Sequence, residues 1–176
     1  MVVGKNQNKG FTLVEMLVVI FIMVLFSVLV ISAYGNGQQK YALNSAVQKL
    51  AADLHSAQNL ALSGTAQAPD TPVGYGIHVK TATQYVLFYN IAGMNPPDQY
   101  RYRSNPPVPS KEIGTINLSS GATVNLANDV FFTPPDPTTY FNGSPAASGD
   151  SLNFTITMTG GLSQTITVYT NGRIEF

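Results

Sequence analysis

The sequence has no cysteine, and only 10% of its 176 residues are charged. Without cysteine the chain forms no disulfide, has no thiolate nucleophile and supplies no thiolate ligand to a metal. Nine basic side chains balance nine acidic ones, so the net charge is zero. A protein that binds nucleic acid by bulk electrostatics needs a concentrated basic face. The composition therefore argues against a nucleic-acid partner.

Residue patterns that carry catalysis or bind metals are also missing. The two histidines, His55 and His78, have no cysteine or glutamate at metal-ligand spacing, so we expect no metal site and no cofactor. Asp129, Asp136 and Asp150 lie in or beside expected loops without EF-hand spacing. Solvated loops are the favoured interpretation there, and a loop calcium site is the alternative. There is no nucleophile elbow, phosphate-binding glycine loop or Ser/His/Asp set. We predict no catalytic residue and do not expect an enzyme.

The N-terminal third has the organisation of a leader followed by a membrane-length helix. Residues 1–10 are short and basic through Lys5 and Lys9, and positive charge before an apolar segment keeps that end on the cytoplasmic side. The run from Met16 to Tyr34 contains neither charge nor proline. As a helix it would span about 28 Å, close to the thickness of a bilayer hydrocarbon core. The remainder of the chain is more polar and is expected to be exported.

Glu15 is the exception within this apolar region. An ionised carboxylate inside a membrane segment costs about 2.5–3.5 kcal/mol at the centre and less near the interface, so such a residue normally has a partner. If the chain were cut after Gly10, Phe11 would carry a new α-amino group four residues from Glu15. That amine, on the same or a neighbouring subunit, is one candidate counter-ion. Solvation of Glu15 at the headgroup level is the other interpretation.

The stretch Gly10-Phe11-Thr12-Leu13-Val14-Glu15 resembles the class III signal of type IV pilins and type II secretion pseudopilins. The resemblance implies that a prepilin peptidase cuts between Gly10 and Phe11 and methylates the new Phe11 amine. It also implies that Glu15 neutralises the terminal amine of an adjoining subunit during filament assembly. The expected partners are that peptidase, membrane lipid, an inner-membrane assembly platform and other pilin or pseudopilin subunits, bound through the N-terminal helix.

A second helical region follows the membrane-length segment. Apolar residues recur at helical spacing within residues 35–64, at Leu43, Val47, Leu50, Leu54, Ala57 and Ala61. The glycines of Gly35-Asn36-Gly37 predict a weak point, and Gly64 predicts the end of the helix. Residues 48–62 are similar to the helix of the H-type pseudopilins (the GspH/FimT class), except that Gln58 stands where arginine is usual.

Residues 65–176 have the period of two that is typical of β-strands. We predict a hairpin of residues 75–79 and 84–91, a short strand at 99–103, weaker strands at 111–118 and 122–126, and a strand at 130–133. Residues 134–150 are expected to form a loop, followed by strands at 152–158, 163–170 and 173–176. In the expected strand 99–103, Arg101 and Arg103 flank Tyr102. Such a pair either contacts an anionic partner or forms a solvated face, which is the commoner case.

These patterns predict an α+β fold of the pilin type. A long N-terminal helix spans the membrane with its first half, residues 11–34, and packs on an antiparallel β-sheet domain with its second half. The expected protein is a single-pass subunit of the cytoplasmic (inner) membrane with an exported C-terminal domain. We expect a structural minor pilin or pseudopilin of a type II secretion or type IV pilus-like filament. The alternative is a β-domain that binds DNA, a surface or secreted cargo and is displayed by the same anchor.

Overall fold

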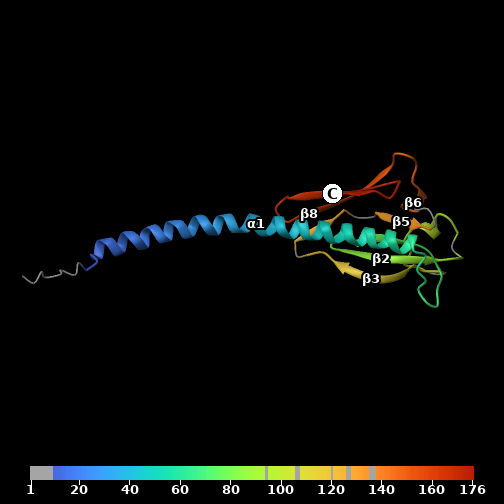
Figure 1. Cartoon of the computed structure of the whole chain (residues 1–176), viewed down its shortest axis with the longest axis horizontal. Helices are drawn as coiled ribbons and strands as arrows, with labels where there is room; N and C mark the ends of the chain where they lie inside the picture. The colour runs from blue at the N-terminus through green and yellow to red at the C-terminus, as the bar shows by residue number, and fades with distance from the viewer. Residues whose placement is uncertain (1–9, 94, 106–107, 120, 126–127, 135–137) are drawn as a thin grey trace, which may run out of the picture. The chain divides into compact units, whose positions relative to one another are not determined.

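The structure is a computed structural model that describes residues 10–93, 95–105, 108–119, 121–125, 128–134 and 138–176, without the side chains of residues 29–36. The chain divides into two compact units, Met1–Gln38 and Gln39–Phe176. A single helix, α1 (Leu13–Leu62), contributes to both units (Figure 1). We describe each unit by itself.

In the first unit, the described side chains from Phe11 to Val28 are all exposed, most of them large and apolar. No helix in the described part of the chain combines the length and the hydropathy of a membrane span, so the span expected at residues 11–34 is not confirmed. The helical assignment continues through Gly35-Asn36-Gly37. The weak point expected there is therefore not a break in the helix, because a helical glycine costs only about 1 kcal/mol relative to alanine, too little to end a helix of 50 residues.

The second unit contains two antiparallel sheets. Along the six-stranded sheet the order is β3-β2-β1-β5-β6-β7, and along the four-stranded sheet it is β10-β9-β8-β4. The strands of the first sheet are β1 (Pro72–Thr81), β2 (Gln84–Ile91), β3 (Lys111–Asn117), β5 (Asp129–Thr133), β6 (Thr138–Phe141) and β7 (Ser144–Pro145). The second sheet consists of β4 (Ala122–Val124), β8 (Ser151–Met158), β9 (Ser163–Tyr169) and β10 (Ile174–Glu175).

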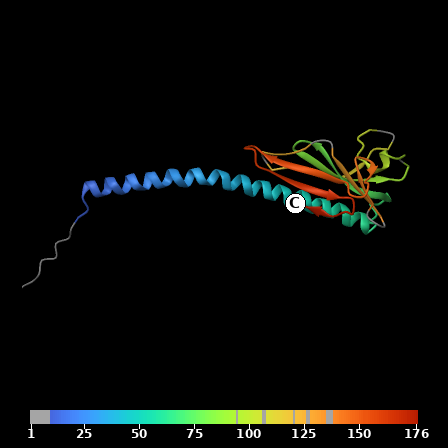
Figure 2. The ribbon, with the colours of Figure 1, turned by 90° about the horizontal axis from the view of Figure 1, so that it is seen from above.

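The end of α1 supplies one wall of the core. The predicted apolar stripe is confirmed, since every one of its six residues is buried, with Leu50, Leu54 and Ala57 fully so. In Figure 1 this end of the helix runs in front of the sheets, with β8 above it and β2 and β3 below, and Figure 2 shows it lying along the strands. The opposing side chains include Tyr75, Ile77, Tyr85, Val130, Phe132, Phe154, Ile156, Ile166 and Val168.

A polar contact also joins the helix to the sheet. The Tyr85 hydroxyl donates a hydrogen bond to the Asp53 carboxylate at 2.6 Å. Burial of the phenol, and next the hydrogen bond to Asp53, raise the pKa of Tyr85 far above its usual value. The buried ring thus stays neutral and satisfies its hydroxyl on α1, as a buried tyrosine requires.

The six-stranded sheet has a second, smaller apolar cluster on its other face. Phe88 of β2 and Phe131 of β5 are fully buried there and stack with ring centroids 5.7 Å apart. Tyr100 packs near Phe131 and stacks on Tyr140 of β6, while Tyr102 meets the edge of Phe88. Both sides of this sheet are therefore covered, one by α1 and the other by the segment between β2 and β3.

The strand expected at 99–103 is wrong. Residues Asp98–Tyr100 form a single 3-10 turn, η1, and the described residues 101–105 and 108–110 contain no strand. The buried Asn90 explains the difference, because its side-chain amide donates to the carbonyls of Gln99 and Arg101 at 2.9 Å each. These carbonyls are satisfied without a neighbouring strand.

The expected loop at 134–150 is partly wrong as well, because it contains β6 and β7. These two strands form a hairpin around Asn142 and Gly143, whose φ angles are 52° and 85°. Asn-Gly with both residues at positive φ is the preferred two-residue hairpin turn. The hairpin β1–β2 and the paired strands β8 and β9 are confirmed.

Candidate functional site

The first candidate site is the start of α1, where the sequence places Gly10, Phe11 and Glu15. Gly10 and Phe11 are exposed and lie in non-helical backbone, and Phe11 is 74% exposed. The peptide bond that joins them therefore lies outside the helix, which begins at Leu13. A peptidase that needs an extended substrate would find this bond free of helical hydrogen bonds.

Thr12 caps the helix at this point. Its side-chain oxygen accepts a hydrogen bond from the backbone N–H of Glu15 at 3.2 Å, and its carbonyl accepts from Met16 at 3.2 Å. Threonine followed three residues later by glutamate is the spacing of a capping box. This spacing is visible in the sequence, although the sequence-based prediction for Glu15 rested on its charge alone and did not include Thr12.

The Glu15 carboxylate is exposed in the first turn of α1. From Gly10 onward, the described residues provide it with no ion-pair partner. A negative charge is favourable at this position because the N-terminal end of a helix carries a partial positive charge. Phe11 is still joined to Gly10, so its nitrogen is an amide rather than the amine that we expect as the counter-ion.

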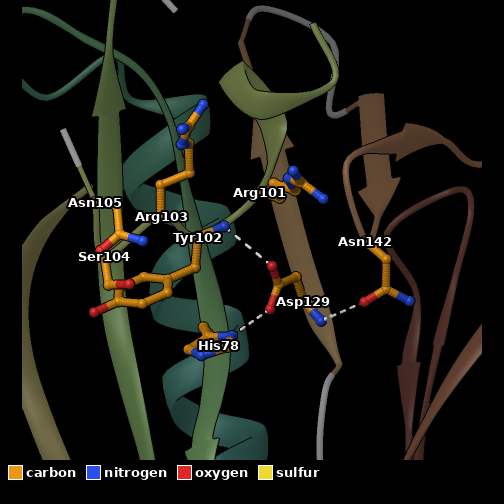
Figure 3. Close-up of a pocket in the computed structure, with 8 residues that line it drawn as sticks. All are labelled: His78, Arg101, Tyr102, Arg103, Ser104, Asn105, Asp129 and Asn142. Atoms are coloured by element: carbon orange, nitrogen blue, oxygen red, sulfur yellow. Dashed lines mark hydrogen bonds and ion pairs between the residues drawn. The ribbon is translucent and has the colours of Figure 1, made fainter. Parts of the chain in front are cut away.

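The second candidate site is an open cavity of about 420 Å³ on the outer face of the six-stranded sheet. At its centre, Asp129 is 8% exposed. One carboxylate oxygen pairs with Nδ1 of His78, and the other accepts from the backbone N–H of Tyr102 at 3.0 Å. The backbone N–H of Asp129 donates to the Asn142 side chain at 2.8 Å. Figure 3 shows Asp129 between these three partners.

Tyr102 closes one side of the cavity. Its ring stacks on His78 with centroids 4.2 Å apart and planes 6° from parallel. Its hydroxyl donates to Glu112, which also accepts from Lys80 Nζ at 2.9 Å. Burial, followed by the bond to Glu112, raises the pKa of Tyr102 to about 12, while the same bond and Lys80 lower the pKa of Glu112.

The two arginines of the cavity share one carboxylate. Arg101 approaches Asp98 with Nη2 at 2.6 Å and Nε at 2.9 Å, and Arg103 pairs with the other oxygen of Asp98. The side chains are 47% and 29% exposed, respectively. The sequence singled out these arginines, but it placed them on a strand and gave no sign of Asp98 as their partner.

The remaining sequence candidates do not gather into a site. His55 is exposed on α1, and Asp150 accepts from the backbone N–H of Ala147 at 2.9 Å. Asp136 lies outside the described residues. Within the parts of the chain that are described, no three histidine, aspartate or glutamate side chains lie close enough together to hold a metal ion.

Comparison with known proteins yields one match. The family model for the prokaryotic N-terminal methylation motif matches residues 5–34. No curated protein and no solved structure matches the chain. The matched motif is the class III signal of type IV pilins and pseudopilins. A motif of this kind implies processing by a prepilin peptidase and assembly with pilin subunits, and it suggests membrane anchoring and export.

Proposed function

We propose that this protein is a structural minor pilin or pseudopilin of a type II secretion or type IV pilus-like filament, cut by prepilin peptidase between Gly10 and Phe11. The observation that carries the proposal is the methylation motif at residues 5–34. The position of the Gly10–Phe11 bond supports it, because that bond is exposed and precedes the Thr12 cap of α1.

Residues 11–34 anchor the subunit in the cytoplasmic membrane before it enters a filament. The support comes from the sequence, where Lys5 and Lys9 precede an apolar run without proline. The domain that follows is exported. We take its role to be structural rather than enzymatic, because the sequence presents none of the catalytic motifs considered above.

Glu15 pairs with the methylated Phe11 amine of an adjoining subunit and thereby sets the register between helices. Two observations support this role. The carboxylate has no partner among the residues described from Gly10 onward, and the surrounding side chains of α1 are exposed and apolar. When such helices pack together, an unpaired carboxylate would lose its water, which is costly.

Within the pseudopilins, the H-type class fits best. The helix positions that carry the similarity, Leu50, Leu54, Ala57 and Ala61, are all buried against the sheets. Gln58 departs from the arginine that is usual in the class, and it has its own hydrogen bond to Gly172 in the turn between β9 and β10. The departure is therefore compatible with the same packing of the helix.

Mass spectrometry of the protein co-expressed with a prepilin peptidase tests the proposal. The mature chain should begin at Phe11 and carry one added methyl group on its amine. A peptidase variant without activity is the control and should leave the leader attached. A mature chain that begins at Met1 despite active peptidase, or one that is cut near Ala33, would refute the proposed function.

A further inference from the structure

The cavity beside Asp129 is lined by several side chains that can donate hydrogen bonds. Asn142 Oδ1 is engaged by the backbone of Asp129, and its Nδ2 points away from Asp129 (Figure 3). Asn105 and Ser104 also line the cavity, and both residues are exposed. Both Asp129 oxygens are occupied by His78 and the Tyr102 backbone, so the carboxylate belongs to the wall of the cavity.

The arginine pair adds charged donors at the same rim. One carboxylate, Asp98, serves both Arg101 and Arg103, so the three side chains together carry a formal charge of +1. Each guanidinium has five N–H groups in a planar fork. Asp98 engages Nε and Nη2 of Arg101 and Nη1 of Arg103, which leaves other N–H groups of both side chains for a ligand. Guanidinium forks suit carboxylate and phosphate oxygens.

The walls of the cavity are fixed before a ligand arrives. Asp129 ties three segments that are distant in sequence: β1 through His78, the segment before β3 through Tyr102, and the β6–β7 turn through Asn142. The buried Asn90 side chain donates to the carbonyl of Arg101 at 2.9 Å. A preformed concave site loses less free energy on binding than one that must be ordered.

We propose that this cavity binds the oxyanion group of a small ligand, a carboxylate or a phosphate, through the guanidinium groups of Arg101 and Arg103 and the amides of Asn105 and Asn142. The inference is independent of the role in a filament, because it concerns only residues of the second unit. It would give a subunit with a structural role a second property, the capture of an acidic small molecule.

Nuclear magnetic resonance of the full chain in detergent micelles tests this proposal. The backbone amides of Tyr102, Asn105 and Asn142 should shift and saturate at millimolar sodium phosphate, sodium glucuronate or both, at constant ionic strength. A response to phosphate alone identifies a phosphate ligand, a response to glucuronate alone identifies a carboxylate, and a response to both identifies a general oxyanion site. Glucose, which is neutral, should cause no shift. No saturable shift with either anion, or an equal shift with glucose, would overturn the proposal.

Two variants locate the binding. Arg101→Gln should weaken anion binding at least tenfold, and its backbone carbonyl still accepts from Asn90, so folding is expected to survive. Asn105→Asp places a negative charge on an exposed side chain of the cavity and should weaken binding to a similar degree. Arg173→Gln is the matched control, since Arg173 pairs with Glu175 near the C-terminus and does not line the cavity. Wild-type affinity in both cavity variants, or equal loss in the control, would refute the assignment.

Discussion

Gln58 of α1 donates a hydrogen bond from its side-chain amide to the backbone carbonyl of Gly172 at 3.1 Å. Gly172 lies in the turn between β9 and β10 with a φ of 77°, and its backbone N–H donates to Tyr169 at 2.9 Å. A Cβ at Gly172 would collide with the Gln58 amide. The Gln58 side chain of α1 therefore packs closely against the turn at Gly172 and forms a hydrogen bond with it.

Replacing Gln58 by alanine should therefore lower stability. The change removes one partly buried hydrogen bond, which is worth about 0.5–1.5 kcal/mol. The free energy of unfolding from denaturant titration measures the loss. Gln48→Ala is the matched control, because Gln48 is exposed on the same helix and the same substitution there changes only solvated atoms. An equal effect of the two substitutions would contradict the role of the Gly172 contact.

A methyl group at Gly76 should be strongly destabilising. On β1, a Cβ at this position would meet the carbonyl oxygen of Val130 and the rings of Phe131 and Phe88. Overpacking of this kind costs about 1–3 kcal/mol or more, so we expect Gly76→Ala to lower the melting temperature by several degrees.

Gly114→Ala provides the control for this prediction. Gly114 also lies in a strand of the same sheet, and a Cβ there has no heavy atom within 4 Å. The melting temperature of the Gly114→Ala variant should remain at or slightly above that of the wild type. If Gly76→Ala left the melting temperature unchanged, this result would contradict the close approach of β5 to Gly76 on β1.

The raised pKa of Tyr102 predicts that the protein loses stability at alkaline pH. Its folded pKa is raised to about 12 from an ordinary value of 10.0, so folding favours the neutral phenol. This contribution is fully present below pH 10.0 and is lost as the pH rises toward about 12. Ring-carbon resonances of labelled tyrosine, assigned with Tyr102→Phe, measure the titration directly.

Glu112→Gln separates the two causes of that shift. Burial of the phenol is the larger cause and the carboxylate is the smaller one. The variant should therefore lower the pKa of Tyr102 while leaving it above the ordinary tyrosine value. A return to the ordinary value would show that the carboxylate dominates, and no change would show that the Tyr102–Glu112 hydrogen bond is absent in solution.

Glu15→Gln should leave cleavage at Gly10 intact and impair filament assembly. The amide keeps the shape of the side chain and the Thr12 cap, which uses only the backbone N–H of Glu15, but it cannot neutralise an amine. Processing is followed by the mass of the mature chain, and assembly by the amount of subunit recovered in sheared filaments. Unaffected assembly would refute the role of the carboxylate as a counter-ion.

Local patterns made part of this fold predictable. The spacing of Leu43 to Ala61 depends only on the helical period, and the β1–β2 hairpin depends on alternation around a short turn, so both could be recognised from the sequence. The pairing of β5 with β1 and the assembly of the cavity could not. His78 and Asp129 are 51 residues apart, and nothing in the neighbourhood of either predicts their contact. The strand predicted at 99–103 does not form. Hydrogen bonds from side chains, rather than from a neighbouring strand, satisfy the backbone polar groups of this segment.

The cap at Thr12 has an electrostatic consequence for a subunit that has lost its leader. All hydrogen bonds of the cap involve residues after Phe11, so cleavage would leave the backbone of α1 unchanged and alter only the charge at its start. The new ammonium group would then stand at the positive end of a helix dipole, an arrangement that costs about 0.3–1 kcal/mol. An isolated mature subunit would be electrostatically frustrated at its tip, and contact with the acidic side chain of a neighbour would relieve that frustration.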